Sequence, residues 1–385
     1  MGYFHKGEGQ HIEQSAKEFC QNVIRKDFES FVKDKQFSCD VFEKMGKVGF
    51  LGAMIPEEYG GAGMNMQNYA ILMESIACYG GGSIALTLTA HHSLAAMHIV
   101  HAGTEEQKRI YLSKLARGKM IGAWCLTEPN AGSDAFGAGM RTVATQMDSG
   151  WLINGSKQFI TNGSIANVYI VIAKVNSKNP NIGDGYGVFI VPRSSKGVIQ
   201  CRSENNKMGM HASDTATVIF EDVQVDAGAK MYFGGKSSTY QVLNNGRVSI
   251  SALACGLMRS ALSEAVAYAR GRESFGKPIA EYQGVSFPLA DASSELTSSW
   301  AMVEKAALAA DQGTLSPRLA SETKLRVTRS SYEACLAASN VFGGYGYLLD
   351  YRVVQDFCDS RLLQIGEGAD NMQRLVITKA LFSES

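Results

Sequence analysis

The sequence predicts an α+β protein of three consecutive parts: an N-terminal helical domain, a middle antiparallel β domain and a C-terminal four-helix bundle. Two observations predict this order. The spacing of apolar residues changes from the helical period to a period of two and then back. A chain of 385 residues, 45% of them apolar, is also long enough for two or three domains. We place the domains at residues 1–121, 122–234 and 235–385.

Apolar residues recur at helical spacing through the first 120 residues. Side chains three and four positions apart share one face of a helix, so each such run predicts an amphipathic helix. The runs are Ile12, Ala16, Phe19 and Val23, then Phe42, Met45 and Val48, then Tyr69, Leu72, Met73 and Ile76. A fourth run covers 84–100 and ends at Gly103. The first part is therefore expected to be all helical.

The middle part alternates apolar and polar residues in short runs rich in β-branched side chains. The runs are "GAWCLTE", "MRTVATQM", "WLING", "VYIVIAKV", "YGVFIV" and "ATVIFEDVQV". Turn-forming segments such as "PRSSKG" separate them. This pattern is typical of strands in an antiparallel sheet.

Helical spacing returns after residue 236 in longer pieces. The predicted helices cover 248–270, 287–312, 317–342 and 352–365. Short loops join them, as in helix bundles.

Charge and composition restrict the classes of partner. Lys plus Arg number 37 and Asp plus Glu number 37, so no net field attracts the chain to nucleic acid. The apolar run "VYIVIA" is far shorter than the roughly 20 residues that cross a bilayer. The N-terminal "MGYFHKGEGQHIEQ" resembles neither a secretory signal nor a transit peptide. We therefore expect a cytoplasmic protein that binds neither nucleic acid nor membrane.

Cysteines and histidines give no metal motif. The eight cysteines are scattered without a C-x-x-C pair, which indicates reduced thiols. His91, His92, His98 and His101 fall on one predicted helix, but no H-E-x-x-H or matching carboxylate pair accompanies them. We expect them to pack the helix or line a pocket, and we expect no metal.

Two nucleotide-binding patterns are incomplete. "GRESFGKP" at 271–278 contains G-x-x-x-x-G-K, but Pro278 replaces the hydroxyl residue of a P-loop and a helix precedes it instead of a strand. No G-x-G-x-x-G follows a strand, so a Rossmann site is also absent from the pattern. Arg272, Ser274 and Lys277 remain suitable donors to phosphate.

One carboxylate, Glu367, stands between two glycines in "IGEGADNMQR", after the largely apolar run Leu362, Leu363 and Ile365. Asp370, followed three residues later by Gln373, resembles a capping-box helix start, so Glu367 should lie in the loop before that helix. Taken alone, this residue would be interpreted as a solvated loop glutamate.

At "WCLTEPNAGSDA" (124–135) the sequence resembles the flavin and thioester loop of the acyl-CoA dehydrogenase family. Five further segments follow the family's order: "PEEYGGAG", "FITNGS", "RESFGK", "FGGYGY" and "GEGADNMQRLV". Six ordered motifs over most of the chain make coincidence very improbable. The resemblance implies the family's helix, β, helix fold and an extended FAD bound without a Rossmann domain, which would explain the missing fingerprint.

The resemblance also implies which residues hold FAD. Thr161 should lie near flavin N5, and Phe159 stands where many relatives have Trp. Arg272 and Ser274 should reach the diphosphate of an FAD held mainly by a neighbouring subunit, which implies a homodimer or homotetramer. The full implied set is Trp124, Cys125, Leu126, Thr127, Gly132, Ser133, Phe159, Ile160, Thr161, Arg272, Ser274, Phe275, Gln283, Val341, Phe342, Gly343, Gly344, Ala369 and Asn371.

For the chemistry, the resemblance implies that Glu367 is the base that removes the α-proton of an acyl thioester. Such a base needs a dry site that raises its pKa toward the operating pH. The backbone N–H of Glu367 should bind the thioester carbonyl, and hydride should leave the β-carbon for flavin N5. Some relatives carry their base just before the arginine equivalent to Arg247, but here that position is Gly246. The implied substrate-binding set is Ser133, Asn244, Arg247, Glu367 and Gly368.

The sequence leaves the substrate and its direction of reaction open. The acyl group could be carried by CoA or by a carrier protein, and an enoyl-thioester reductase or an oxidase would use the same residues. An electron-transfer flavoprotein is the expected electron acceptor. Ala369 replaces a threonine common in the family, which removes one expected contact to FAD or ligand. A non-catalytic relative that binds FAD and nucleic acid is the contrasting class, disfavoured by the zero net charge and the presence of Glu367.

Overall fold

A computed structural model describes residues 4–177 and 185–383, and its N-terminal part is helical as predicted. A π-helical segment, Thr89–Ala96, joins α5 to α6, so the predicted run 84–100 is one continuous helical stretch. The helices are α1 (Glu8–Phe19), α2 (Phe28–Asp34), α3 (Cys39–Lys47), α4 (Met66–Gly80), α5 (Gly82–Leu88), α6 (Met97–Ala102) and α7 (Glu105–Ala116). Local capping explains some starts: Thr104 and Gln107 form a capping box at α7.

The middle part is a seven-stranded sheet in the order β1-β4-β2-β3-β7-β6, with β5 paired to β4. The strands are β1 (Gly122–Cys125), β2 (Val143–Met147), β3 (Gly150–Thr161), β4 (Val168–Asn176), β5 (Tyr186–Pro192), β6 (Lys196–Ser203) and β7 (Thr215–Asp226). Four strand pairs are antiparallel, as expected, but the sheet is mixed because β1 and β2 both pair with β4 in parallel. The pairing direction depends on the path of the loop between β1 and β2, which local alternation does not encode.

Strand β6 was not predicted. It lies at the edge of the sheet, and most of its side chains are exposed on both faces. The alternation of buried and exposed residues that signals a strand is therefore weak in this segment.

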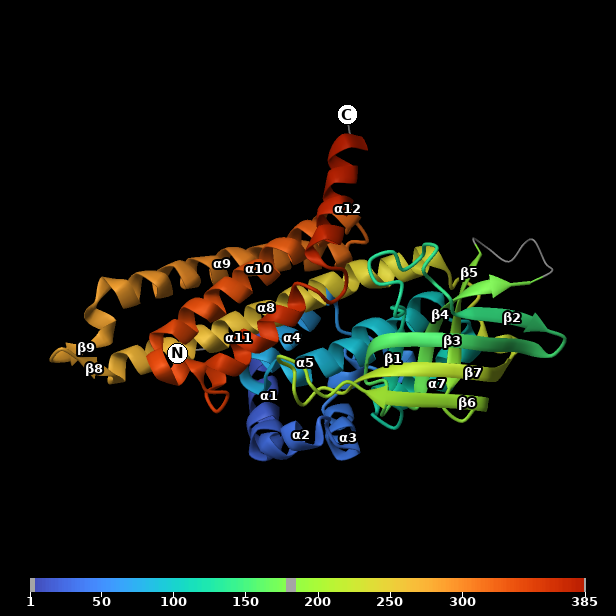
Figure 1. Cartoon of the computed structure of the whole chain (residues 1–385), viewed down its shortest axis with the longest axis horizontal. Coiled ribbons are helices and arrows are strands. Elements are labelled where there is room, and N and C mark those ends of the chain that lie inside the picture. Colours follow the sequence, from blue (N-terminus) through green and yellow to red (C-terminus); the bar gives the residue numbers. More distant parts are fainter. Residues whose placement is uncertain (1–3, 178–184, 384–385) are drawn as a thin grey trace.

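The C-terminal part consists of long helices, as predicted (Figure 1). These are α8 (Lys236–Gly271), α9 (Gln283–Asp311), α10 (Pro317–Val341), α11 (Arg352–Leu363) and α12 (Asp370–Ser383), with a small hairpin of β8 (Glu273–Ser274) and β9 (Lys277–Pro278) after α8. Helix α8 begins well before the predicted residue 248. The apolar spacing did not reveal its first turns because they are polar. At α10, Ser316 caps the N-terminus and Pro317 occupies the first turn.

Helix α8 is the axis of the molecule. It packs against α4, α9, α10 and α11, and Leu253, Ala254 and Cys255 at its centre are fully buried. Of the helices in the described part of the chain, α8 is the only one long and apolar enough to cross a membrane by length and composition. Its apolar window is 72% buried inside the fold, as expected for a core helix.

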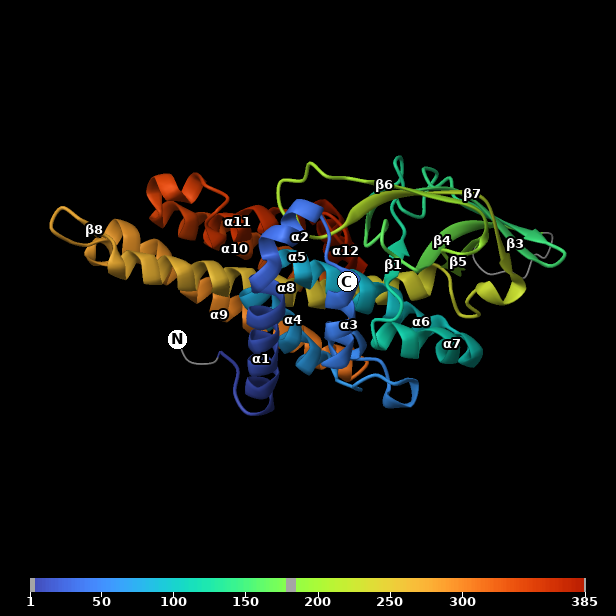
Figure 2. The same cartoon turned by 90° about the horizontal axis from the view of Figure 1, so that it is seen from below.

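The two views show how the parts are arranged. Helix α8 leads from the sheet at one end of the molecule to the β8–β9 hairpin at the other, while α12 projects away from the body (Figure 1). The N-terminal helices cross beside the long helices between these two ends (Figure 2). At 36 residues, α8 spans about 54 Å, since each residue adds about 1.5 Å.

Candidate active site

Glu367 lies in the short loop between α11 and α12, as predicted. It has a left-handed backbone with φ 53°, and Gly368 follows with φ 95°. The backbone of Gly368 therefore favours glycine, and a Cβ there would come within 2.8 Å of Gln373 Nε2 and displace that amide. Gly366 has ordinary surroundings, and nothing in the structure requires a glycine at that position.

The expected capping box at Asp370 is wrong. Helix α12 already begins at Asp370, and the preceding Ala369 accepts backbone hydrogen bonds at the helix start. Gln373 instead turns back toward the loop, where its Nε2 donates to Gly368 O at 2.6 Å and to Glu367 O at 3.3 Å. The glutamine therefore fixes the loop that carries the candidate base.

The Glu367 carboxylate points at α8. A side-chain carbon placed on Gly246 would lie 2.1 Å from Glu367 Oε2 and 3.2 Å from Leu94 Cδ2. The position that holds the base in some relatives thus meets Glu367 in space. Because Gly246 has no side chain, the carboxylate occupies the room that one would take.

Glu367 is desolvated and unpaired. Its Oε2 is buried, and within residues 4–177 and 185–383 it has no hydrogen-bond partner. Burial raises the pKa of Glu367 to about 8, against the opposing charges of Lys324 and Arg247. In the same described ranges the Glu367 N–H has no hydrogen-bond acceptor. The residue thus offers a carboxylate able to take a proton near neutral pH, with a free donor beside it.

Two residues of the predicted substrate set lie beside Glu367. Arg247 on α8 is 94% buried, and its Nη1 donates to Asn244 Oδ1 at 2.8 Å and to Ser321 Oγ at 3.2 Å. Its Nη2 lies 3.7 Å from where a Gly368 Cβ would be. Asn244 therefore orients a guanidinium that faces the Glu367 loop.

The predicted flavin loop begins at the end of β1, where a histidine holds Trp124. The indole Nε1 donates to His98 Nδ1 at 2.9 Å, and His98 Nε2 lies 3.0 Å from Ser238 Oγ on α8. Burial lowers the pKa of His98 to about 3, so the ring is neutral. Since an indole can only donate, His98 carries its proton on Nε2 and donates to Ser238.

A buried ion pair holds the next residues of the loop. Lys157 Nζ donates to Glu128 Oε1 at 2.8 Å and to Leu126 O at 2.9 Å, and both side chains are nearly or fully buried. Glu128 also accepts from the backbone N–H groups of Arg141 and Thr142. The two ends of the loop 126–142 are thereby tied to β3.

The motif "FITNGS" lies alongside this loop. Gln158 N donates to Thr127 O at 2.8 Å, so Phe159, Ile160 and Thr161 at the end of β3 follow directly beside the segment Trp124 to Thr127. Phe159 is 64% exposed and has φ 59°, an unusual backbone for an aromatic residue. Ile160 is buried and Thr161 half-buried. An exposed ring held in this way fits one face of a flavin.

Other predicted contacts are exposed near the site. Gly132 and Ser133 lie on the exposed part of the loop after Glu128. Asn371 in the first turn of α12 accepts from Arg374 Nη1 at 2.8 Å. Cys125 and Leu126, in contrast, are buried in the sheet domain, so only their backbone could face a ligand.

The remaining predicted cofactor residues lie at the end of the molecule opposite the sheet. They are Arg272, Ser274, Phe275, Gln283, Val341, Phe342, Gly343 and Gly344, around the β8–β9 hairpin and the end of α10 (Figure 1). Arg272 and Gly246 are both on or next to α8 and are separated by about 39 Å of helix. Phe275 is 95% exposed. This group and the segment around Trp124 and Phe159 are therefore far apart within one chain.

The structure adds residues that the sequence did not indicate. Lys324 on α10 is fully buried and donates from Nζ to Gly368 O at 2.9 Å, and Gln373 binds the same carbonyl. The signal for Lys324 was its helical spacing from Ala320 and Val327, both buried on the same face of α10. His98 was predicted only to pack or line a pocket.

No metal site is found in the described parts of the chain. His91 and His92 are fully buried, and each ring bonds a backbone carbonyl, of Leu115 and Leu51 respectively. All eight cysteines are free, and Cys39 is exposed. The "GRESFGKP" segment forms the hairpin after α8, so it lacks the buried strand of a P-loop.

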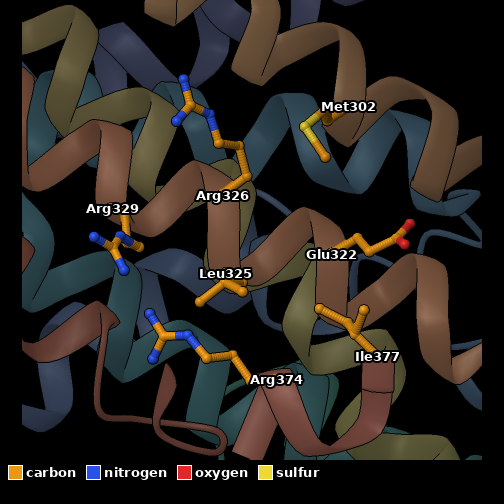
Figure 3. A pocket seen from close by; sticks show the side chains of 7 residues that line it. All are labelled: Met302, Glu322, Leu325, Arg326, Arg329, Arg374 and Ile377. Atoms are coloured by element: carbon orange, nitrogen blue, oxygen red, sulfur yellow. The ribbon is translucent and has the colours of Figure 1, made fainter. Parts of the chain in front are cut away.

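A surface depression of about 530 Å³ lies between α9, α10 and α12 (Figure 3). Its lining residues are Met302, Glu322, Leu325, Arg326, Arg329, Arg374 and Ile377. Arg326 is paired with Glu295 at 2.7 Å. None of the sequence-predicted site residues lines this depression, so it is separate from the Glu367 site.

An unpaired carboxylate oxygen against the central helix and an exposed aromatic ring at the end of β3 suit a flavin-dependent dehydrogenase that acts on acyl thioesters. Comparison with known proteins identifies the family. Residues 6–119 match the model of the acyl-CoA dehydrogenase N-terminal domain, 123–223 that of the middle domain and 234–382 that of the C-terminal domain. The chain belongs to the acyl-CoA dehydrogenase family.

Individual relatives match over nearly the whole chain. A probable acyl-CoA dehydrogenase of Bacillus subtilis, YngJ, is 38% identical, with 97% of this chain and 98% of the relative covered. The CarC subunit of the caffeyl-CoA reductase–Etf complex of Acetobacterium woodii is 34% identical, with 97% and 98% covered. Butyryl-CoA dehydrogenase from Megasphaera elsdenii superposes with a TM-score of 0.91 at 33% identity, with 99% and 100% covered. Other solved relatives contain FAD or its reduced form, and one is a prolyl acyl carrier protein oxidase.

Proposed function

We propose that this chain catalyses FAD-dependent α,β-dehydrogenation of an acyl thioester with Glu367 as the base. The observation that carries the proposal is the buried, unpaired Oε2 of the half-buried Glu367, which lies against Gly246. Because burial raises its pKa to about 8, the carboxylate can hold a proton taken from a carbon acid near neutral pH.

The chain's own residues account for proton removal and charge stabilisation. Glu367 accepts the α-proton, and its N–H, which has no acceptor in the described residues, is available to donate to the thioester carbonyl. Negative charge developing on that oxygen would then meet a fixed donor. Bound FAD supplies the acceptor for the hydride that leaves the β-carbon. The product is an α,β-unsaturated thioester.

The residues around β3 and β1 support a flavin site. Phe159 would cover one face of the ring, with Ile160 and Thr161 beside it, and Trp124 to Thr127 would follow the pyrimidine edge. Gly132 and Ser133 would stand at the start of the ligand channel, with Asn244, Arg247 and Gly368 near the thioester. Ala369, just before α12, and Asn371 in its first turn would adjoin the cofactor. Ala369 has no hydroxyl to bind it.

The distant group around Arg272 supports a shared site and hence a homodimer or homotetramer. Arg272 and Ser274 of one protomer would bind the diphosphate of its neighbour's FAD, with Phe275, Gln283 and the residues 341–344 around it. A guanidinium suits phosphate because it pairs with two oxygens at once. Their separation of about 39 Å from Gly246 along α8 leaves the neighbour's cofactor as the one within reach. Sedimentation of a monomeric, FAD-saturated holoenzyme would contradict this arrangement.

The proposal also covers the electron acceptor and the carrier of the acyl group. An electron-transfer flavoprotein as partner is supported by the relative CarC, which belongs to a reductase–Etf complex. The same relative favours a second candidate, reduction of an enoyl thioester on the same residues. CoA and a carrier protein remain alternative carriers. A cytoplasmic location, which the sequence predicts, is part of this proposal.

The test uses purified holoenzyme and Glu367→Gln. The native protein should be yellow, and its flavin should bleach anaerobically with a suitable acyl thioester. Glu367→Gln should keep its flavin spectrum yet bleach at least about 100-fold more slowly, since a positioned base contributes about 10² to 10⁴-fold. Full bleaching in this variant would contradict the assignment. Screening acyl-CoAs beside acyl carrier proteins, and enoyl thioesters with reduced enzyme, separates the alternatives.

A further inference from the structure

Lys324 is a buried cation that has no role in the chemistry described above. It lies on α10 with no exposed surface, and its Nζ donates to the Gly368 carbonyl at 2.9 Å. Within residues 4–177 and 185–383 no carboxylate oxygen lies within ion-pair distance of Nζ. Burial of an ammonium is costly unless its protons are donated to hydrogen bonds and its charge is compensated. Because Lys324 lies next to the Glu367 loop, we look for both in that loop.

The loop above Lys324 needs to be held in place. Two consecutive residues, Glu367 and Gly368, have left-handed backbones, a conformation that is unfavourable for a glutamate. Lys324 and Gln373 bind the same carbonyl, that of Gly368, from two helices. Glu367 therefore stands on a loop fixed from α10 and α12, with its side chain directed at Gly246 on α8.

We propose that Lys324 is a positioning residue for the Glu367 base: its ammonium holds the loop through Gly368 O, and its positive charge favours the ionised carboxylate. This inference rests on the proposed function. Lys324 touches no reacting atom, so it acts through Glu367.

Charged and titratable groups face Glu367 from four helices. Lys324 on α10 and Arg247 on α8 oppose the effect of burial on the pKa of Glu367. Asp370 on α12 acts in turn on Lys324, and Tyr69 on α4 is close enough for Glu367 to raise its pKa further. Burial lowers the pKa of Lys324 to about 8, while Asp370 and Glu367 raise it. At neutral pH the lysine is thus mostly charged, and Arg247 remains as the second cation.

The experiment follows proton removal without redox chemistry. An acyl-CoA with sulfur in place of the β-carbon has α-protons but no β-hydride to give up. Exchange of its α-protons with D₂O, followed by NMR on the holoenzyme, therefore reports the base alone. In the native protein the exchange rate should rise with pH as Glu367 ionises.

Lys324→Met should move this rise to higher pH by about one unit and slow exchange at pH 7 about tenfold, since an opposite charge a few ångströms away lowers a carboxyl pKa by about 1–3. Lys324→Arg, which keeps the charge, should restore the native pH profile. The control is Lys305→Met, which removes an exposed lysine from α9 and should leave the profile unchanged.

Three outcomes would overturn the inference. Lys324→Met could show the native profile, or Lys324→Met and Lys324→Arg could be equally slow without any movement of the profile, as a role in packing alone would give. Should Lys324→Met fail to fold, Lys324→Gln, which keeps a donor without the charge, decides: a moved profile supports the inference and a native profile overturns it. Native-rate exchange by Glu367→Gln would instead overturn the proposed function, so the two failures are distinguishable.

Discussion

Two clusters of buried charge lie about 18 Å apart along α8 and differ in how their carboxylates are treated. We call Glu13, Glu74 and Arg259 the paired cluster, and Glu367, Arg247 and Lys324 the base cluster. In the paired cluster Arg259 bonds Glu13 at 2.6 Å and both oxygens of Glu74 at 2.6 and 2.7 Å. In the base cluster neither cation forms an ion pair with Glu367 within the described residues. Five of these six side chains are buried and Glu367 is half-buried with a buried Oε2, so the main difference lies in the hydrogen-bond donors.

The pKa values follow the donors. Burial raises the pKa of Glu13, but the His5 N–H, the charge of Arg259 and the Tyr79 hydroxyl outweigh it, and the pKa falls below its usual value. For Glu367, burial dominates because Lys324 and Arg247 act only through space, and the pKa rises to about 8. The comparison teaches that this fold raises the pKa of one carboxyl group by withholding donors from it, while it supplies donors to others.

The largest effect is expected from breaking the paired cluster. Arg259→Met leaves two buried carboxylates without their cation, which should cost about 3–5 kcal/mol of unfolding free energy. Because the pKa of Glu13 is lower folded than unfolded, its ionised form stabilises the native state above about pH 4–5, and this contribution is lost on acidification. Arg259→Met should therefore also flatten the acid-side loss of stability. Chemical denaturation from pH 4 to pH 8 measures both.

The matched control is Arg270→Met, which removes an exposed arginine from the same helix and should change stability by less than about 0.5 kcal/mol. Equal stability losses in the two variants would show that Arg259 does not neutralise buried charge.

Glu367 was predictable and Lys324 was not, for a physical reason. "GEG" is a local pattern, and its meaning comes from five other motifs in order. Lys324 lies in a helix with charged residues at Glu322 and Arg326, and a lysine there is usually on the solvent side. Only its spacing from Ala320 and Val327 places it on the buried face. Which loop it would meet depends on how α10, α11 and α12 pack.

The same distinction holds for the fold. Periodicity was enough for the order of helices, sheet and helices, because each element carries its own apolar face. The parallel pairing of β1 and β2 with β4 was not predictable, since it depends on the route of the chain between strands. The hydrogen bond from Trp124 to His98 was not predictable either. It joins β1 to α6, and the sequence pattern of neither element indicates the other as its partner.

A smaller effect is expected from filling the space that Glu367 occupies. In Gly246→Ala the new methyl group would lie 2.1 Å from Glu367 Oε2, so the carboxylate must move. Displacement of a catalytic group by about 1 Å can cost about 100-fold in rate. Anaerobic flavin reduction by a substrate thioester should slow by about that factor while the flavin remains bound.

Gly271→Ala is the matched control, because a methyl group there meets nothing within 4 Å at the other end of α8. It should reduce flavin at the native rate. If Gly246→Ala also reduced flavin at the native rate, the position of the Glu367 carboxylate against α8 would not matter for the reaction.

The smallest effect is expected from giving the Glu367 carboxylate a hydrogen-bond donor, which Glu13 already has. Leu94 Cδ2 and Glu367 Oε2 both lie close to the point where a Gly246 Cβ would be, 3.2 and 2.1 Å from it. Leu94→Asn keeps a similar shape and adds an amide donor there. Since a hydrogen bond to the charged form lowers a carboxyl pKa, the pH profile of α-proton exchange should move to lower pH by about one unit. That movement is opposite to the one expected for Lys324→Met.

Leu94→Met, which adds no hydrogen-bond donor, should keep the native profile. An unmoved profile in Leu94→Asn with full flavin content would mean that donors do not separate the base cluster from the paired one.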